Sequence, residues 1–299
     1  MIRFGTNPIA WANDDDQTLG AHIPTEQILR EAGEIGFDGI ENGHRWPNDP
    51  AELKEALGAH GLAFITGWYS TELLTRSVEE EIENFQPHLA KLKHNGCTVC
   101  VTAETSNAIH GEDSKSLADT PRLDAAQMQA FGAKMEEFAQ YMASQGIALV
   151  YHHHMGTVVE TAEDIEGFMA ATGPETKLLF DTGHFYFGAN GADPAPMLAR
   201  YVDRVSHFHA KNVRPEIMAQ VRDGGLSFLE GVRRGVFTVP GDAEGGVAFT
   251  PCLTILAKAG YQGWLVIEAE QDPDQRNPFE YQSLGLKALK QAASEAGLV

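Results

Sequence analysis

Short apolar runs alternate with helix-like segments along the whole chain of 299 residues. Such a run is typical of a strand that is buried on both faces, as in a parallel sheet. The sequence contains eight of them: Arg3–Thr6, Gly39–Glu41, Ala63–Gly67, Thr98–Thr102, Ala148–His152, Lys177–Phe180, Arg204–His209 and Trp264–Glu268. Eight β/α units in a chain of this length predict an α/β fold, a (β/α)8 barrel, in preference to a doubly wound sheet.

Sequence signals mark where several of the intervening helices begin. Ser77-x-x-Glu80, Asp124-x-x-Gln127 and Thr161-x-x-Asp164 follow the capping-box pattern, in which two side chains bond free backbone N–H groups of the first turn. Thr250 before Pro251 predicts a further start, with a capping hydroxyl ahead of a proline at the first helical position. These signals support a regular alternation of strands and helices.

No linker or low-complexity tract interrupts the chain, and we expect one catalytic domain over residues 1–299. No glycine-rich dinucleotide motif follows a strand, and no P-loop motif occurs. Three long irregular insertions, Trp11–Ile23, Thr105–Leu123 and Val213–Phe249, all follow strands. Active-site loops of a barrel occupy that position, so these insertions are predicted to form walls or a lid.

Composition limits the partners of this chain. Its formal net charge is −20, and its densest basic cluster, Arg233-Arg234, is too small to attract a phosphate backbone, so no nucleic-acid partner is expected. No stretch approaches the roughly 20 apolar residues of a membrane span, and the N-terminus lacks the hydrophobic region of a signal peptide. We therefore expect a cytoplasmic protein with no membrane partner.

The three cysteines do not form a recognisable metal or redox motif. Cys97 and Cys100 belong to one strand-like run, where side chains three residues apart point to opposite faces, and Cys252 is isolated. No second cysteine pair is present to complete a zinc site. Three ordinary buried thiols are predicted.

Four segments of the second half place histidines and carboxylates where apolar strands end. They are Ile147–His154, Leu178–His184, Val205–Lys211 and Trp264–Glu270. The C-terminal ends of barrel strands converge on one mouth, and a buried charged or imidazole group there must be paired or bind metal. Mixed nitrogen and oxygen ligands suit Mn²⁺, Co²⁺, Fe²⁺ or Zn²⁺, so the sequence predicts a divalent metal site.

Strand alternation narrows the ligands without fixing them. His152 and His154 share one face of their strand, whereas His153 points away. His207 pairs with His209 in the same way, and Glu268 pairs with Glu270. One residue of each pair is expected to bind the metal, while the other contacts substrate or a ligand.

Three of these motifs, Asp181-Thr-Gly-His184, His209-Ala-Lys211 and Gly260-Tyr-Gln-Gly-Trp-Leu-Val-Ile-Glu268, resemble those of the xylose-isomerase-like TIM barrel enzymes. That superfamily includes sugar isomerases, epimerases and endonuclease-IV-like proteins. The resemblance implies Asp181, His209 and Glu268 as metal ligands. The superfamily commonly has a glutamate after strand five, and this sequence departs from it with His152.

A narrower resemblance covers essentially the whole chain. Gly5-Thr-Asn-Pro-Ile-Ala-Trp-Ala-Asn13, Tyr151-His-His-His-Met-Gly-Thr157, Gly235-Val-Phe-Thr-Val-Pro-Gly-Asp242 and Gly263-Trp-Leu-Val-Ile-Glu-Ala-Glu-Gln-Asp-Pro273 look like the inosose dehydratases of myo-inositol catabolism. The resemblance implies a hydro-lyase that removes water from 2-keto-myo-inositol (scyllo-inosose) to give a trihydroxycyclohexane-dione. It also implies Mn²⁺ or Co²⁺ and a dependence on glutathione, although no residue pattern explains a glutathione site.

The chemistry of such a dehydration assigns expected roles. A divalent metal would stabilise the negative charge that develops on an enediolate. Its expected ligands are Asp181, His209, Glu268 and His152. His184, Lys211 and Glu41 are the candidates for proton transfer, and Glu41 is equally a candidate for binding a hydroxyl. The expected substrate-binding residues are Asn7, Trp11, Trp68, His154 and Arg214, with core packing the alternative for both tryptophans.

Three other functions remain open at this point. A sugar or inosose isomerase or epimerase would use the same metal and enediolate and would return the proton to carbon. An endonuclease-IV-like phosphodiesterase would need more metal ligands and a basic surface. A sugar-binding module would hold metal without turnover. The expected partner is a small polyol or ketose for every one of these functions except the phosphodiesterase. Homo-oligomerisation is possible for all of them.

Overall fold

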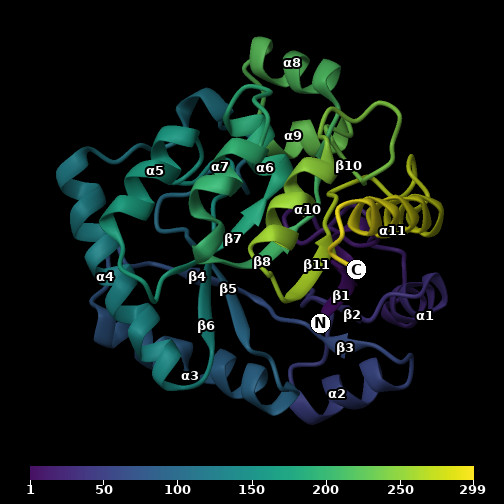
Figure 1. The fold of residues 1–299 in the computed structure, drawn as a ribbon, viewed down its shortest axis with the longest axis horizontal. Helices are drawn as coiled ribbons and strands as arrows, with labels where there is room; N and C mark the ends of the chain where they lie inside the picture. The colour runs from purple at the N-terminus through teal and green to yellow at the C-terminus, as the bar shows by residue number, and fades with distance from the viewer.

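The central sheet is parallel and curls into a barrel in the computed structural model, which describes residues 1–299 (Figure 1). Its strands follow the order β3-β2-β1-β11-β8-β7-β6-β5-β4. They are β1 (Ile2–Thr6), β2 (Gly39–Ile40), β3 (Ala63–Phe64), β4 (Trp68–Thr71), β5 (Val99–Glu104), β6 (Ala148–His152), β7 (Lys177–Asp181), β8 (Val205–His209) and β11 (Gly263–Ile267). Parallel pairing throughout this sheet agrees with the predicted (β/α)8 barrel.

The third strand of the barrel is split in two. β3 pairs with β2, β4 pairs with β5, and only residues 65–67 separate them. The amide of Ile65 donates to Ile40 O at 3.1 Å, and the hydroxyl of Thr66 donates to Val99 O at 2.9 Å. Residues 65–67 are thus hydrogen-bonded to β2 on one side and to β5 on the other, which closes the sheet. The sequence predicted one continuous strand here, over Ala63–Gly67.

Helices surround the strands (Figure 1). They are α1 (Thr25–Ile35), α2 (Pro50–Gly58), α3 (Val78–Asn95), α4 (Ala125–Ser144), α5 (Ala162–Ala171), α6 (Thr182–Gly188), α7 (Ala195–Tyr201), α8 (Pro215–Asp223), α9 (Phe228–Arg233), α10 (Phe249–Lys258) and α11 (Pro278–Glu295). The capping boxes predicted at Ser77, Asp124 and Thr161 all form, at the starts of α3, α4 and α5. The predicted cap at Thr250 is wrong, because α10 begins at Phe249, two residues before Pro251, and Ala248 precedes it without a side-chain cap.

Side chains alternate between two cores along each strand. Phe180 and Phe208 point outward into the main core of 58 buried residues, which fills the space between strands and helices. Leu179 points inward and packs with Val99, Val101 and Val150 inside the barrel. Side chains along a strand alternate with a period of two residues. The side chains at the strand ends that point inward in the same way are therefore those of His152, Asp181, His209 and Glu268.

The insertion over Val213–Phe249 is more regular than the sequence indicated. It contains α8, α9 and β10 (Phe237–Thr238), and β10 pairs antiparallel with β9 (Asn212–Val213). Ten buried residues, including Met155, Phe228 and Phe237, form a separate small core beneath it. The expectation of an irregular segment was therefore wrong here, since its short elements carry too few periodic residues to be recognised.

The three cysteines are buried and free, as expected. Burial raises the pKa of Cys97 and of Cys252 to about 12, which keeps both thiols protonated and unreactive. None of the helices is both long enough and apolar enough to span a lipid bilayer. The organisation into one domain stays a prediction.

Candidate functional site

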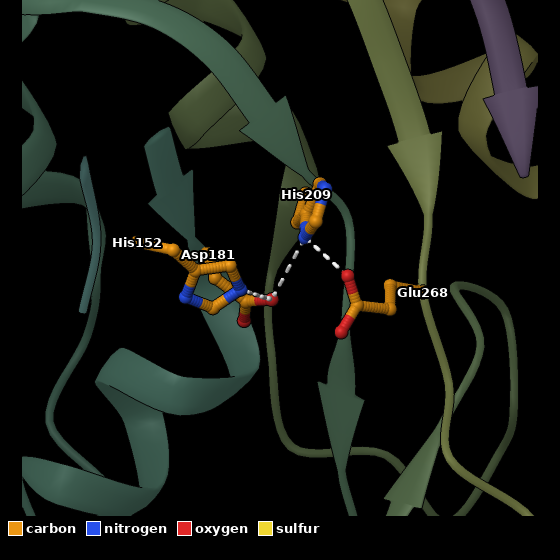
Figure 2. A group of neighbouring side chains, drawn as sticks. All are labelled: His152, Asp181, His209 and Glu268. Atoms are coloured by element: carbon orange, nitrogen blue, oxygen red, sulfur yellow. Dashed lines mark ion pairs between the residues drawn. The ribbon is translucent and has the colours of Figure 1, made fainter. Parts of the chain in front are cut away.

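Four side chains from neighbouring strand ends converge in the barrel mouth (Figure 2). His152 and Asp181 end β6 and β7, His209 ends β8, and Glu268 directly follows β11. Asp181 stands beside His209 in the register of β7 and β8. One possible ligand atom from each of these four residues lies within 4.8 Å of the ligand atoms of the other three. The metal site predicted from the sequence requires such proximity.

Two donor atoms of this cluster lack close partners in the protein. His152 Nε2 and Asp181 Oδ2 are buried, make no hydrogen bond and lie 3.8 Å apart. His209 Nδ1 lies 3.5 Å from Asp181 Oδ2 and is paired with Glu268 Oε2 at 2.5 Å. Buried polar atoms without partners are rare, and a divalent cation among them would satisfy all of them at once. The cluster fits a divalent metal site.

Hydrogen bonds on the far side of each side chain orient the donor atoms. His152 Nδ1 lies 2.7 Å from His153 O, so the Nδ1–H form leaves the Nε2 lone pair toward the cluster. Asp181 Oδ1 accepts from the amides of Gly183 and His184, both at 2.8 Å, at the start of α6. That bond pair leaves Oδ2 as the free oxygen.

Glu41 orients His209 in the same way. Its Oε1 lies 3.1 Å from His209 Nε2 and 2.7 Å from His207 Nε2, and its Oε2 accepts from Asn7 Nδ2 at 2.8 Å. Burial would raise the pKa of Glu41, but the two histidines outweigh burial and lower it to about 2. Glu41 is therefore an anion whose partners fix the orientation of the His209 ring.

The cluster attracts positive charge. Burial favours the neutral form of His209, yet Glu268, Glu41 and Asp181 outweigh burial and raise its pKa well above the ordinary value. Burial lowers the pKa of His152 to about 4, so this ring is neutral near pH 7 and its Nε2 is available as a ligand. Carboxylates that attract a proton to His209 would attract a metal cation to the same place.

A cavity of about 320 Å³ opens beside the cluster. His209 and Glu268 form part of its wall, together with Glu41, Asn7, Trp68 and His154. The ring of Trp68 lies 5.6 Å from that of His152 and 5.5 Å from that of His154. The structure thus places three of the five predicted substrate-binding residues on one cavity that borders the metal cluster.

Trp11 and Arg214 lie outside this cavity. Trp11 is fully buried in the main core, and its Nε1 donates to Glu31 Oε2 at 2.7 Å. Arg214 is also buried, and it donates to Gly235 O and to Asp242 Oδ2, both at 2.5 Å, inside the 213–249 insertion. The structure therefore gives Trp11 a core position and gives Arg214 contacts that hold the insertion.

His184 and Lys211 lie behind the cavity wall. Both are buried, and Lys211 Nζ lies 2.7 Å from His184 Nε2, 2.9 Å from Glu268 Oε1 and 2.7 Å from Glu270 Oε2. Burial disfavours the ammonium, but Glu268 and Glu270 outweigh it and raise the pKa of Lys211. Lys211 is consequently a buried cation held between two carboxylates.

One cavity residue was identified in the sequence only as half of a pair, and three others were not identified as site residues. Glu270 lines the cavity with a buried, unpartnered Oε1, and burial raises its pKa to about 7. Strand alternation pairs it with Glu268, and that pairing was its only sequence signal. Asp14, Asp15 and His110 also line the cavity, and they come from the first two insertions, where no periodicity identifies them.

Comparison with known proteins places the chain in a family. The model of the xylose isomerase-like TIM barrel family matches residues 29–297. The chain is 42% identical to the rhizopine catabolism protein MocC of Rhizobium meliloti, over 99% of this chain and 90% of that protein. It is 40% identical to an inosose dehydratase of Bacillus cereus (strain AH820), over 99% of this chain and 98% of that protein.

Solved structures of low sequence identity share the fold. A probable 3-DHS dehydratase, AsbF, from Bacillus anthracis matches with a TM-score of 0.68 at 17% identity, over 96% of this chain and 98% of that one. A D-allulose 3-epimerase from Methylomonas sp. matches with a TM-score of 0.67 at 17% identity, over 97% of both chains. The chain belongs to the xylose isomerase-like TIM barrel family, and inosose dehydratases and MocC are among its relatives within that family.

Proposed function

We propose that this protein is a metal-dependent hydro-lyase that removes water from 2-keto-myo-inositol to give a trihydroxycyclohexane-dione. The observation that carries the proposal is the buried cluster of two imidazoles and two carboxylates beside a cavity, in a chain 40% identical over nearly its whole length to an inosose dehydratase.

His152, Asp181, His209 and Glu268 are the proposed ligands, and Mn²⁺ or Co²⁺ is the proposed ion. Two imidazoles and two carboxylates without a thiolate suit these metals. When bound, such an ion acts as a Lewis acid that stabilises negative charge on substrate oxygens. His152 supplies a neutral donor where the superfamily commonly has a glutamate, so the proposed site carries one negative charge fewer.

The cavity favours an uncharged substrate. Five carboxylates line it, those of Asp14, Asp15, Glu41, Glu268 and Glu270, and no lysine or arginine does. A phosphate or carboxylate group would be repelled there, whereas hydroxyl groups can donate to these oxygens. We therefore propose a neutral polyol or ketose, with Asn7 and His154 bonding its hydroxyls and Trp68 covering an apolar C–H face.

Dehydration requires two proton movements. A base takes the proton from the carbon next to the carbonyl, and the hydroxyl on the following carbon leaves with a proton as water. Lys211 joins His184 to Glu270, which lines the cavity with an Oε1 that has no partner, and we assign proton transfer to this group of three. Glu41, held by two histidines and Asn7, is assigned to orienting His209 and bonding a hydroxyl.

The test is incubation of the purified protein with 2-keto-myo-inositol and Mn²⁺ or Co²⁺, with and without glutathione. We expect the ultraviolet absorbance of the dione to grow with the wild-type protein and to stay constant with Asp181→Asn. A higher rate in the presence of glutathione would support the dependence that the sequence resemblance implies. Formation of an epimer without ultraviolet absorbance would replace this proposal with the isomerase or epimerase reaction. Stable metal content without turnover of any polyol or ketose would replace it with a binding function.

A further inference from the structure

A second group of potential metal ligands adjoins the first. His154, His184 and Glu270 are buried, and one ligand atom from each lies within 4.8 Å of the other two. This group is already occupied by a cation of the protein, because Lys211 Nζ lies 2.7 Å from both His184 Nε2 and Glu270 Oε2. The same ammonium donates to Glu268 Oε1 at 2.9 Å and therefore touches both groups.

The Asp181-Thr-Gly-His184 motif is built around this lysine. The hydroxyl of Thr182 donates to Lys211 O at 2.7 Å and accepts from Lys211 N at 3.2 Å, which fixes the lysine backbone. A Cβ on Gly183 would lie 2.4 Å from Lys211 Cγ and 2.8 Å from its Cβ and Cδ, so only glycine leaves room for the lysine stem. His184 then contacts the ammonium itself.

Residues outside the motif complete the enclosure. The aromatic ring of Phe237 on β10 lies 4.7 Å from Lys211 Nζ, at a distance where a cation–π contact stabilises the charge. The side chain of Lys211 is fully buried. A buried lysine with carboxylate, imidazole and aromatic partners is a fixed cation and not a mobile surface charge.

The buried charges in the two groups, together with Glu41 beside His209, explain why a monocation stands here. Glu41, Asp181, Glu268 and Glu270 are four buried carboxylates, and Lys211 is the one ammonium among them. One divalent ion in the first group would leave a single negative charge. A second divalent ion beside Lys211 would make the buried site positive, and Lys211 would repel that ion at short range.

We propose that the Lys211 ammonium occupies a second cation position formed by His154, His184 and Glu270, and thereby restricts this protein to one divalent ion. The inference rests on the metal centre of the proposed function. It predicts that His154, His184 and Glu270 form a latent metal site, which becomes available when the lysine is removed. A second divalent ion in place of Lys211 would balance the four carboxylates.

Metal stoichiometry tests this inference without reference to activity. Wild-type protein and the variants Lys211→Ala and Lys211→Met are incubated with excess Mn²⁺, desalted and analysed for metal per chain. Methionine keeps most of the stem packing and lacks the terminal charged atom, which protects the fold if alanine does not. We expect one ion in wild type and two in the variants, with the spin coupling of neighbouring Mn²⁺ ions in the electron paramagnetic resonance spectrum.

Two further variants locate the second ion. The double variant Lys211→Ala with Glu270→Gln should return to one ion, because it removes a proposed ligand. Lys134→Ala should keep one ion, since Lys134 is a partly buried lysine that donates to Leu73 O and Arg76 O away from the site. One ion in wild type and in every folded Lys211 variant would overturn this inference alone. A wild-type chain without bound ion would overturn the proposed metal centre itself.

Discussion

At the scale of single residues, the candidate metal cluster depends on hydrogen bonds made away from it. His209 can present Nδ1 only because Nε2 faces Glu41 Oε1 at 3.1 Å, and Asp181 presents Oδ2 because Oδ1 caps α6. Such outer contacts fix the orientation and tautomer of a ligand, and their loss typically lowers metal affinity 10–100-fold.

Replacing Glu41 with glutamine tests this dependence. We expect Glu41→Gln to weaken Mn²⁺ binding by about 10–100-fold, because the neutral amide bonds the two histidines more weakly and its NH2 group cannot accept from Asn7 Nδ2. Isothermal titration with Mn²⁺ measures the change. Glu81→Gln is the matched control, since Glu81 is equally buried but bonds Tyr69 and the amide of Glu72. If Glu41→Gln and Glu81→Gln bind Mn²⁺ with equal affinity, Glu41 does not help to hold the metal ligands in place.

Removal of a proposed ligand has a larger effect. Asp181→Ala and His209→Ala should each lose bound metal and lower kcat/KM by about 100-fold or more, because the Lewis acid contributes several kcal/mol to the transition state. Metal analysis and the dione assay measure the two losses. Full activity in both variants would refute the assignment of these residues as ligands.

Residue positions in the cluster were predictable, but their partners were not. Alternation along apolar strands separates His152 from His153, and the family resemblance points to Asp181, His209 and Glu268, which the structure has beside His152. Glu41 and His209 are 168 residues apart, and no local pattern connects them. Sequence therefore indicates which side chains face inward, while their pairing depends on how strands β2 and β8 meet across the barrel.

At the scale of elements, local signals predict helix starts better than short strands. The three capping boxes form because their hydrogen bonds lie within one turn. The break in the third strand arises from pairing of β3 and β4 with different neighbours, which no local signal reveals. Thr250 has the residue type of a cap, but tertiary packing of Phe249 in the main core starts α10 earlier.

The capping box of α3 makes a pH-dependent contribution to stability. Glu80 Oε2 accepts from the Ser77 amide at 2.8 Å, and this bond lowers the pKa of Glu80 below its ordinary value of 4.5. A depressed carboxyl pKa stabilises the fold above the unfolded pKa, and the contribution disappears as the pH falls through the folded pKa. Glu80→Ala should therefore lower the urea midpoint at pH 7 more than at pH 3.

Glu79 provides the control for this prediction. It is exposed in the same first turn and is not part of the capping box formed by Ser77 and Glu80. Glu79→Ala should have a smaller effect than Glu80→Ala at pH 7. If both variants shift the urea midpoint equally at both pH values, the capping bond contributes no specific stability.

At the scale of the whole molecule, one arginine joins the three insertions around the cavity. Arg233 of α9 lies 2.7 Å from Asp16 Oδ2 in the first insertion and 2.6 Å from Asp113 Oδ1 in the second. Asp15 and His110 from those same two insertions line the cavity. The 213–249 insertion supports the wall from behind, where Phe228 packs against the ring of His154 at 5.2 Å.

Breaking this junction should loosen the cavity wall. Exposed ion pairs contribute about 1 kcal/mol or less, so Arg233→Met should raise amide exchange in residues 11–23 and 105–123 by about fivefold. Hydrogen-exchange mass spectrometry measures this, and a lower kcat/KM for the substrate is expected alongside. Arg234→Met is the matched control, because Arg234 pairs only with Glu230 within α9. Unchanged exchange in both insertions would mean that other contacts hold them.

The central claim is that the ends of four barrel strands bind one divalent ion. A crystal structure of the Mn²⁺-loaded protein, with anomalous scattering recorded at the manganese edge, tests it most directly. We expect a single anomalous peak coordinated by His152 Nε2, Asp181 Oδ2, His209 Nδ1 and the carboxylate of Glu268. A fully active, Mn²⁺-loaded protein whose peak lies on other residues, or that shows no peak at the strand ends, would contradict the claim.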